Sequence, residues 1–248
     1  MRRLEVINAA VEMSNLITQF ENYFKTTNIH ILMNPLYNLP DRKNVKAFKI
    51  LADALQKKET ALIGITGAGG AGKTTFAENI VKFFGTEQAL TIDLDDYLLS
   101  RTERGKLEVT GYNPVANNLG LASKHIEQLL AGQRIAKPCY NHATGEILPE
   151  EEVEPKSLLV VEGVTTLYPE LKMLHDISFF LDALEETQIK SRIQRDVNER
   201  GYTLDEALQL FAAIKPDYER FIKPTKEHAN IVFQVDTNYI MHPKKVTL

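Results

Sequence analysis

Short apolar runs alternate with segments of helical periodicity from residue 60 onward. Between the runs, apolar residues recur at helical spacing over Thr75–Phe84 and near residues 118–131, 184–200 and 204–213. The runs themselves predict buried strands at Ala61–Thr66, Ala89–Asp93, Ser157–Glu162, Ile177–Asp182 and Asn230–Val235. Because strands alternate with helices, we expect an α/β domain over residues 59–248, with a mainly parallel sheet and helices on both faces.

The first 58 residues follow a different pattern. Apolar residues recur at roughly helical spacing over residues 3–25, a proline-containing segment at residues 34–40 interrupts them, and Asp41 can cap a second helix. We therefore expect a helical N-terminal extension over residues 1–58. Its apolar faces would pack on the domain or on a second subunit, which makes a homodimer through these helices an expectation.

Composition narrows the classes of protein to consider. A chain of 248 residues with 44% hydrophobic content can bury the core of one main domain with an attached segment. The net charge of −4 gives no global reason to expect binding to nucleic acid or to an anionic membrane. With Cys139 as its single cysteine, and with neither a signal peptide nor an apolar run that could span a bilayer, the chain is expected to be cytoplasmic or to occupy an organelle lumen.

The first strand and the first helix of the domain are joined by a motif that binds nucleotide phosphates. The stretch satisfies G-x-x-x-x-G-K-[ST], and its residues are Gly67, Ala68, Gly69, Gly70, Ala71, Gly72, Lys73 and Thr74, followed by Thr75. Glycines let backbone N–H groups approach phosphate oxygens at the positive end of the helix. Lys73 supplies a charge and Thr74 a hydroxyl ligand for Mg²⁺, so the sequence predicts a P-loop.

Acidic residues follow two of the other predicted strands. Asp93, Asp95 and Asp96 come at the end of the second strand, where open α/β sheets bind ligands and where a carboxylate can take a proton from an attacking hydroxyl. Glu162 ends another apolar strand, in the form of a Walker B acid that meets Mg²⁺. The alternatives are a capped turn for the aspartates and a solvated strand end for Glu162.

A basic helix follows further along the chain. Arg192 and Arg195 lie about one helical turn apart, with Arg200 near the same face. Guanidinium groups placed over the site would neutralise a transferring phosphoryl group. The alternative is an ordinary soluble helix surface.

In this order, these elements resemble the phosphoribulokinase and uridine kinase family, and most closely the phosphoribulokinase core of plant and cyanobacterial type. The resemblance covers about residues 60–236. Beyond the P-loop it rests on Asp95-Asp96-Tyr97, Asn113–Asn118, Lys137–Gly145, Val160–Gly163, Ile193–Asp196 with Glu199–Gly201, and Lys215–Tyr218.

The resemblance implies a P-loop NTPase fold, ATP and Mg²⁺ as cofactors, and a small-molecule acceptor. It implies that Asp95 is the general base and that Thr74, Glu162 and Asp95 serve Mg²⁺. Lys73 and the P-loop amides would hold the triphosphate, with Arg192 on a mobile lid. The acceptor and the phosphates would be contacted by Tyr97, Arg101, Tyr140, His142, Arg195 and Arg200.

Some positions depart from the family pattern. Leu98 stands where phosphoribulokinases carry a histidine, and Val115 stands where the plant-type enzymes carry an arginine, so polar contacts to a pentose phosphate are expected to be lost. Ala68 and Ala71 occupy the P-loop, where the light-regulated enzymes have a cysteine, so thiol-based regulation is not expected.

We expect an ATP-dependent kinase that phosphorylates a hydroxyl of a small sugar-like metabolite, with a ribulose-5-phosphate-like acceptor favoured. Uridine or cytidine is the alternative acceptor. From another class of protein, a nucleotide-binding regulator with little or no kinase activity is the alternative. The sequence contains no Asn-Lys-x-Asp motif for reading guanine, which argues against the regulator.

Overall fold

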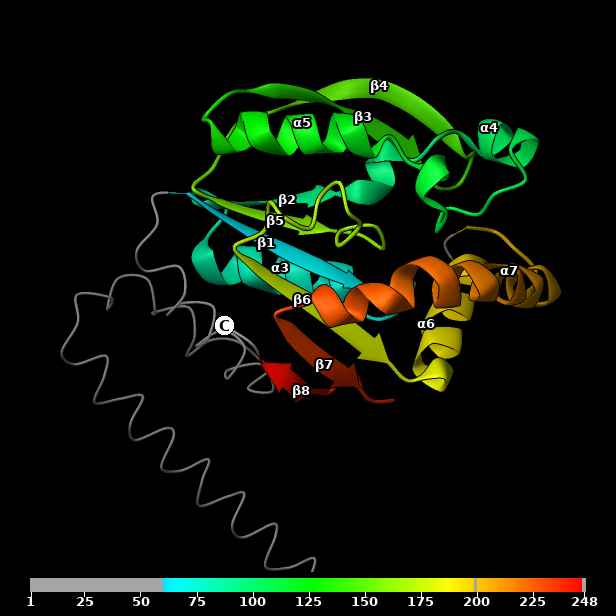
Figure 1. The fold of residues 1–248 in the computed structure, drawn as a ribbon. Helices are drawn as coiled ribbons and strands as arrows, with labels where there is room; N and C mark the ends of the chain where they lie inside the picture. Colours follow the sequence, from blue (N-terminus) through cyan, green and yellow to red (C-terminus); the bar gives the residue numbers. More distant parts are fainter. Residues whose placement is uncertain (1–59, 199, 247–248) are drawn as a thin grey trace, which may run out of the picture. The chain divides into compact units, whose positions relative to one another are not determined.

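The computed structural model describes residues 60–198 and 200–246, and a six-stranded sheet forms the centre of this part of the chain (Figure 1). Neighbouring strands from β2 to β7 are parallel, and β8 pairs antiparallel with β7. In spatial order the strands are β2 (Ala89–Asp93), β5 (Leu158–Glu162), β1 (Ala61–Gly67), β6 (Ile177–Ala183), β7 (Ile231–Val235) and β8 (Met241–Val246). The expected α/β fold with a mainly parallel sheet is confirmed.

The predicted N-terminal helices lie outside the described residues, and so does the homodimer expected through them. The boundary between residues 58 and 59 therefore stays a prediction. In the part of the chain that the structure describes, no helix combines the length and the apolar character needed to cross a membrane.

Four of the helices named below begin at a capping side chain or a left-handed glycine. Ser100, Asn118 and Thr203 each accept a backbone N–H of the first turn through the side chain, and Gly72, with φ of 88°, precedes the first helix. That helix consequently starts at Lys73 and not at the predicted Thr75. The helices are α3 (Lys73–Phe84), α4 (Arg101–Lys106), α5 (Leu119–Leu130), α6 (Glu185–Asn198) and α7 (Leu204–Asp217).

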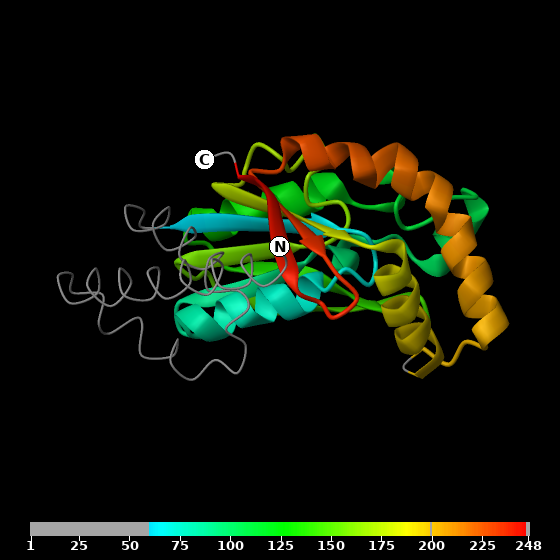
Figure 2. The ribbon, with the colours of Figure 1, turned by 90° about the horizontal axis from the view of Figure 1, so that it is seen from below.

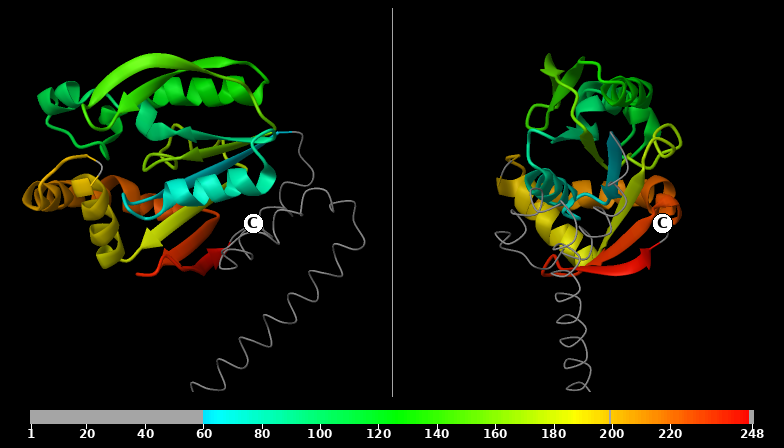
Figure 3. Two further views of the ribbon diagram at one scale, coloured as in Figure 1. Left: turned by 180° about the vertical axis from the view of Figure 1, so that it is seen from behind. Right: turned by 90° about the vertical axis from the view of Figure 1, so that its left-hand side faces the viewer.

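Each face of the sheet buries its own apolar layer, because successive strand residues point to opposite sides. On one face Phe76 of α3 meets Phe179 and Phe233 edge to face, with ring centroids 5.3 and 6.3 Å away. Helix α3 lies behind the sheet in Figure 1 and in front of it in the left panel of Figure 3. The other face carries Val161 and Phe180, which pack in one cluster with Ile126 of α5.

A two-stranded hairpin, β3 (Ile135–Asn141) and β4 (Glu146–Val153), stands apart from the main sheet. The sequence predicted no strands here, because β4 carries the acidic run Glu150–Glu152 and is exposed along most of its length, so it lacks an apolar pattern. In Figure 1 the hairpin lies above the sheet. Helices α6 and α7 lie at the end of the sheet toward which the parallel strands point, and Figure 2 shows these two helices from below.

Candidate active site

The P-loop connects the end of β1 to the start of α3, and its glycines are needed because the loop runs close to its neighbours. A Cβ at Gly67, where φ is 144°, would lie 2.4 Å from the carbonyl oxygen of Leu181. A Cβ at Gly70, where φ is 82°, would lie 2.9 Å from the carbonyl oxygen of Gln188 on α6. Glycine removes both clashes and permits both left-handed conformations. The loop therefore forms a narrow anion cradle at the positive end of α3.

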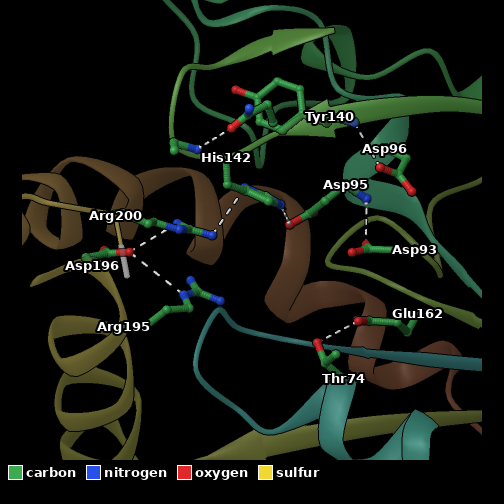
Figure 4. Close-up of polar contacts among 12 residues, drawn as sticks. Thr74, Asp93, Asp95, Asp96, Tyr140, His142, Glu162, Arg195, Asp196 and Arg200 are labelled. Carbon is green, nitrogen blue, oxygen red and sulfur yellow. Dashed lines mark hydrogen bonds and ion pairs between the residues drawn. The ribbon is translucent and has the colours of Figure 1, made fainter. Parts of the chain in front are cut away.

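Thr74 and Glu162 meet beside this cradle. The Thr74 hydroxyl in the first turn of α3 donates to the Glu162 carboxylate at the end of β5, with 2.6 Å between Oγ1 and Oε1 (Figure 4). Burial raises the pKa of Glu162, and the charge of Lys73 opposes that rise. A hydroxyl and carboxylates form the hard-oxygen donor set that Mg²⁺ prefers, so these residues fit the metal that the motif implies.

Asp93 and Asp95 are joined by a short turn after β2. Asp93 lies beside Glu162 in the register of β2 and β5, and its Oδ1 accepts the Asp95 backbone N–H at 2.8 Å. This contact caps the 3₁₀ turn η4 (Leu94–Tyr97), which carries Asp95. Burial first, and then the charges of Asp95 and Glu162, raise the pKa of Asp93.

Asp96 attaches the hairpin to the same turn. Its carboxylate accepts the Lys137 ammonium at 2.5 Å and the Tyr140 backbone N–H at 2.9 Å, and Lys137 is buried. The hairpin is thereby held over η4, and Nε2 of His142 lies 3.7 Å from Oδ2 of Asp95 (Figure 4). Sequence reasoning placed Asp96 among three equivalent acids, whereas the structure gives it a separate anchoring contact.

His142 also faces the basic helix. Arg200 donates through Nη2 to Nδ1 of His142 at 3.2 Å, and because a guanidinium can only donate, Nδ1 is the acceptor. Burial is the main cause that lowers the pKa of His142; the charge of Asp95 opposes this shift, whereas the charges of Arg200 and Arg195 add to it. The neutral ring therefore carries its proton on Nε2, the atom nearest to Asp95.

Asp196 organises two arginines of α6 and Arg200, which follows that helix, and it was not among the predicted site residues. Its side chain is 1% exposed, and its carboxylate lies 3.3 Å from Nε of Arg192, 3.8 Å from Nε of Arg195 and 3.1 Å from Nη1 of Arg200. The signal in the sequence was an acid inside an arginine-rich segment, but its burial required the folded chain. Figure 4 shows Asp196 facing Arg195 and Arg200.

One cavity of about 280 Å³ brings several of the predicted residues together. They come from the P-loop, from the ends of β2 and β5, from the hairpin turn and from the segment around α6. The cavity is lined by Lys73, Thr74, Asp93, Asp95, His142, Ala143, Glu162, Arg195 and Arg200.

Tyr97 and Tyr140, which the sequence assigned to the acceptor, are outside that lining. Tyr97 is buried, and its hydroxyl lies 3.1 Å from Nδ1 of His125. Tyr140 is buried as well, and its hydroxyl accepts a hydrogen bond from Arg104, whose guanidinium lies over the ring. In this structure both tyrosines support the walls, and direct contact with a substrate stays a prediction.

Arg101 and the departures from the family pattern are also outside the lining. Arg101 donates to the carbonyl oxygen of His142 at 2.9 Å and so braces the turn of the hairpin. Leu98 is buried, whereas Val115 is 62% exposed. Neither apolar replacement therefore removes a polar group from the cavity itself.

The comparisons with known proteins agree with this geometry. A family model described as the phosphoribulokinase/uridine kinase family matches residues 62–240. The phosphoribulokinase of Synechocystis sp. is 41% identical over 195 residues, which cover 78% of this chain. A uridine kinase of Clostridium perfringens is 37% identical over 183 residues, which cover 71% of this chain and 87% of the relative.

The solved phosphoribulokinase of Rhodobacter spheroides shares the fold, with a TM-score of 0.58 at 18% identity over 73% of this chain and 71% of the relative. The chain spans 59% of the length of the Synechocystis phosphoribulokinase and 49% of the length of the wheat chloroplast enzyme. The matched part contains the P-loop, both strand-end acids, the hairpin and α6. The chain therefore belongs to the phosphoribulokinase/uridine kinase family.

Proposed function

We propose that this chain is an ATP- and Mg²⁺-dependent kinase that transfers the γ-phosphoryl group to a hydroxyl of a small sugar-like metabolite. The observation that carries this proposal is the shared cavity, which is lined by Asp95, by the P-loop Lys73, by the hydrogen-bonded pair Thr74 and Glu162, and by Arg195 and Arg200. Positioning and charge stabilisation account for most of the catalysis of phosphoryl transfer, and these residue types supply both.

In this mechanism Asp95 accepts the proton of the acceptor hydroxyl while the hydroxyl oxygen attacks the γ-phosphorus, and the bond between that phosphorus and the β,γ-bridging oxygen breaks to release ADP. Nε2 of neutral His142 lies 3.7 Å from Oδ2 of Asp95, so the imidazole is close enough to interact electrostatically with this carboxylate. Lys73, Arg195 and Arg200 stabilise the charge that develops on the phosphoryl oxygens. Thr74 and Glu162 would hold Mg²⁺, which would supply positive charge to the bound triphosphate.

A phosphorylated pentose, similar to ribulose 5-phosphate, is the acceptor that we favour. A second anionic group in the cavity needs cations, since a buried dianion without partners costs several kcal/mol. Arg195 and Arg200 line the cavity, and Arg101 at the start of α4 donates to the carbonyl oxygen of His142 in the hairpin turn beside it. The 41% identity to a phosphoribulokinase supports the same choice.

Uridine or cytidine is the second candidate acceptor, because the chain matches 87% of the length of a uridine kinase. A pure nucleotide-binding regulator is disfavoured. It would have no use for Asp95 and Arg195 in the same cavity as the P-loop lysine.

ADP release measured against a panel of pentoses, pentose phosphates, nucleosides and glycerate tests the proposal. We expect a large rate that depends on one pentose phosphate, and we expect Arg101→Ala or Arg195→Ala to reduce the preference for the phosphorylated form over the free sugar. A preference of the unmodified protein for nucleosides would overturn the favoured acceptor. Slow hydrolysis that no acceptor accelerates would overturn the kinase assignment itself.

A further inference from the structure

Tyr112 lies against the P-loop but was not among the residues expected in the site. It belongs to the segment between α4 and α5, is 7% exposed, and its hydroxyl oxygen accepts the backbone N–H of Gly69 at 2.6 Å. The same oxygen lies 3.4 Å from Nη1 of Arg192 on α6. A tyrosine from a distant part of the chain thus connects the P-loop to the arginine-bearing helix.

The amide that Tyr112 contacts is held from its other side by the P-loop lysine. Nζ of Lys73 donates to the carbonyl oxygen of Ala68 at 3.1 Å, and this carbonyl belongs to the same peptide group as the Gly69 N–H. The P-loop lysine reaches the β- and γ-phosphates in nucleotide sites of this type. The peptide group pinned between Lys73 and Tyr112 therefore lies at the end of the cradle where the terminal phosphate binds.

Tyr112 is itself held by further contacts. Its backbone carbonyl accepts the hydroxyl of Tyr168, which is 2% exposed, and its backbone N–H donates to Oγ1 of Thr110 at 3.1 Å. Thr110 in turn donates to Oδ2 of Asp217, the last residue of α7, at 2.7 Å. These hydrogen bonds fix the backbone of Tyr112, so the position of its ring against the P-loop does not depend only on the contacts of its own hydroxyl.

The hydroxyl of Tyr112 retains a proton to donate. Its oxygen accepts from two donors, the Gly69 N–H and Arg192. Within residues 60–198 and 200–246, the hydroxyl itself donates to no protein group. A phosphate oxygen bound over the cradle would be a strong acceptor for that proton. Arg192 is 12% exposed and keeps its charge balanced through Asp196, so the guanidinium is held beside the phenol.

We propose that Tyr112 is a positioning residue for the terminal phosphate of the nucleotide. It couples the Gly69 amide of the P-loop to Arg192 of α6, so that the two regions converge on the γ-phosphoryl group. This inference rests on the proposed function, because only a nucleoside triphosphate presents that group. It gives the site a means to distinguish the triphosphate from the diphosphate product.

The test compares Tyr112→Phe, which keeps the buried ring, with Tyr218→Phe, which removes a half-buried hydroxyl that forms no hydrogen bond with a P-loop residue in the part of the chain that the structure describes. Calorimetric titrations with ADP and with the non-hydrolysable analogue adenylyl imidodiphosphate give the ratio of the two Kd values. We expect Tyr112→Phe to reduce the preference for the triphosphate analogue about tenfold, the loss of one hydrogen bond to a charged group. Tyr218→Phe should leave the ratio unchanged.

Turnover supplies the second readout. Tyr112→Phe should lower kcat about tenfold with little change in the KM for the acceptor, whereas a purely structural role would lower Tm and leave both nucleotide measurements as they were. In an Arg192→Ala background the same substitution should have a smaller effect, because the two groups act together.

An unchanged ratio of ADP to analogue affinity in Tyr112→Phe would overturn the proposal, whatever happens to Tm. This outcome is separate from a failure of the proposed function. If the unmodified protein phosphorylates no acceptor, the kinase assignment fails, while the nucleotide titrations still decide the role of Tyr112.

Discussion

The phosphate cradle and the arginine-bearing helix hold opposite sides of one cavity by different means. Every residue of β1 is buried, and the loop after it owes its path to glycines and backbone contacts. In α6, by contrast, the only buried residues among those described are Thr187 and Asp196. The cradle is thus fixed by a packed backbone, whereas the arginines are fixed by one buried carboxylate.

The difference predicts that the two regions respond differently to substitution. A backbone cradle changes little when a side chain is replaced, since its amides remain in place. A set of like charges around one acid depends on that acid, because removing it leaves the guanidinium groups without compensation. Substitutions in the two regions should therefore separate nucleotide binding from acceptor turnover.

The largest effect is expected at Asp95, where the two regions face each other. Asp95→Asn keeps the size of the side chain but removes the basic oxygen, so kcat should fall by about 10²–10⁴-fold. Affinity for ADP should change little, because the P-loop is untouched. Steady-state kinetics and calorimetry measure both quantities, and a variant with nearly normal kcat would refute Asp95 as the general base.

Asp196→Asn should give the next largest effect, and it tests whether one carboxylate organises the helix. With the counter-charge gone from between Arg192, Arg195 and Arg200, kcat/KM for the acceptor should fall at least about tenfold and Tm by roughly 5–10 °C. Affinity for ADP should be retained. Loss of ADP binding in parallel would show that cradle and helix are not independent.

Arg195→Ala sharpens the same comparison with a smaller change. The Arg195 side chain is 35% exposed, so its removal should shift Tm by less than about 2 °C while lowering kcat/KM about tenfold. Differential scanning fluorimetry beside the kinetic assay gives both numbers. Equal losses of stability and activity would instead indicate a structural ion pair with Asp196.

The smallest effect is expected at Asp93, where function and stability conflict. Burial and neighbouring acids raise the pKa of Asp93 in the folded protein above its value in the unfolded chain. As the pH rises from the unfolded pKa through the folded pKa, the free energy of unfolding therefore decreases. Asp93→Asn keeps the acceptor for the Asp95 N–H and should raise Tm of the nucleotide-free protein by roughly 1–3 °C near pH 7.

The pH dependence of that gain provides its control. It should shrink as the pH falls toward the ordinary pKa of an aspartate, about 3.9, because the carboxyl is then protonated in both the folded and the unfolded state. Thermal melts from pH 8 to pH 5 without Mg²⁺ measure it. A gain that is constant with pH, or a loss at neutral pH, would contradict the electrostatic explanation.

Local patterns carried much of the prediction. The alternation of apolar runs and helical segments predicted the five parallel strands and the helices α3, α5, α6 and α7, because both depend on side-chain periodicity within one segment, whereas the short α4 was not predicted. The P-loop could be read in the same way, since its glycines and Lys73 are adjacent in sequence. The hairpin was not predicted, because β3 contains Pro138 and β4 is exposed and acidic, so neither strand shows the apolar pattern from which strands were predicted.

What the sequence determined by itself is the family, the fold and the set of charged groups available to the site. Only the tertiary structure decided which of them meet: Asp95 with His142, Asp196 with the arginines, and Tyr112 with Gly69. It also turned Arg101 toward the hairpin and Tyr97 into the core. The physical reason is that contacts such as that between Gly69 and Tyr112 join residues 43 positions apart, and no local preference encodes where the folded chain brings them together.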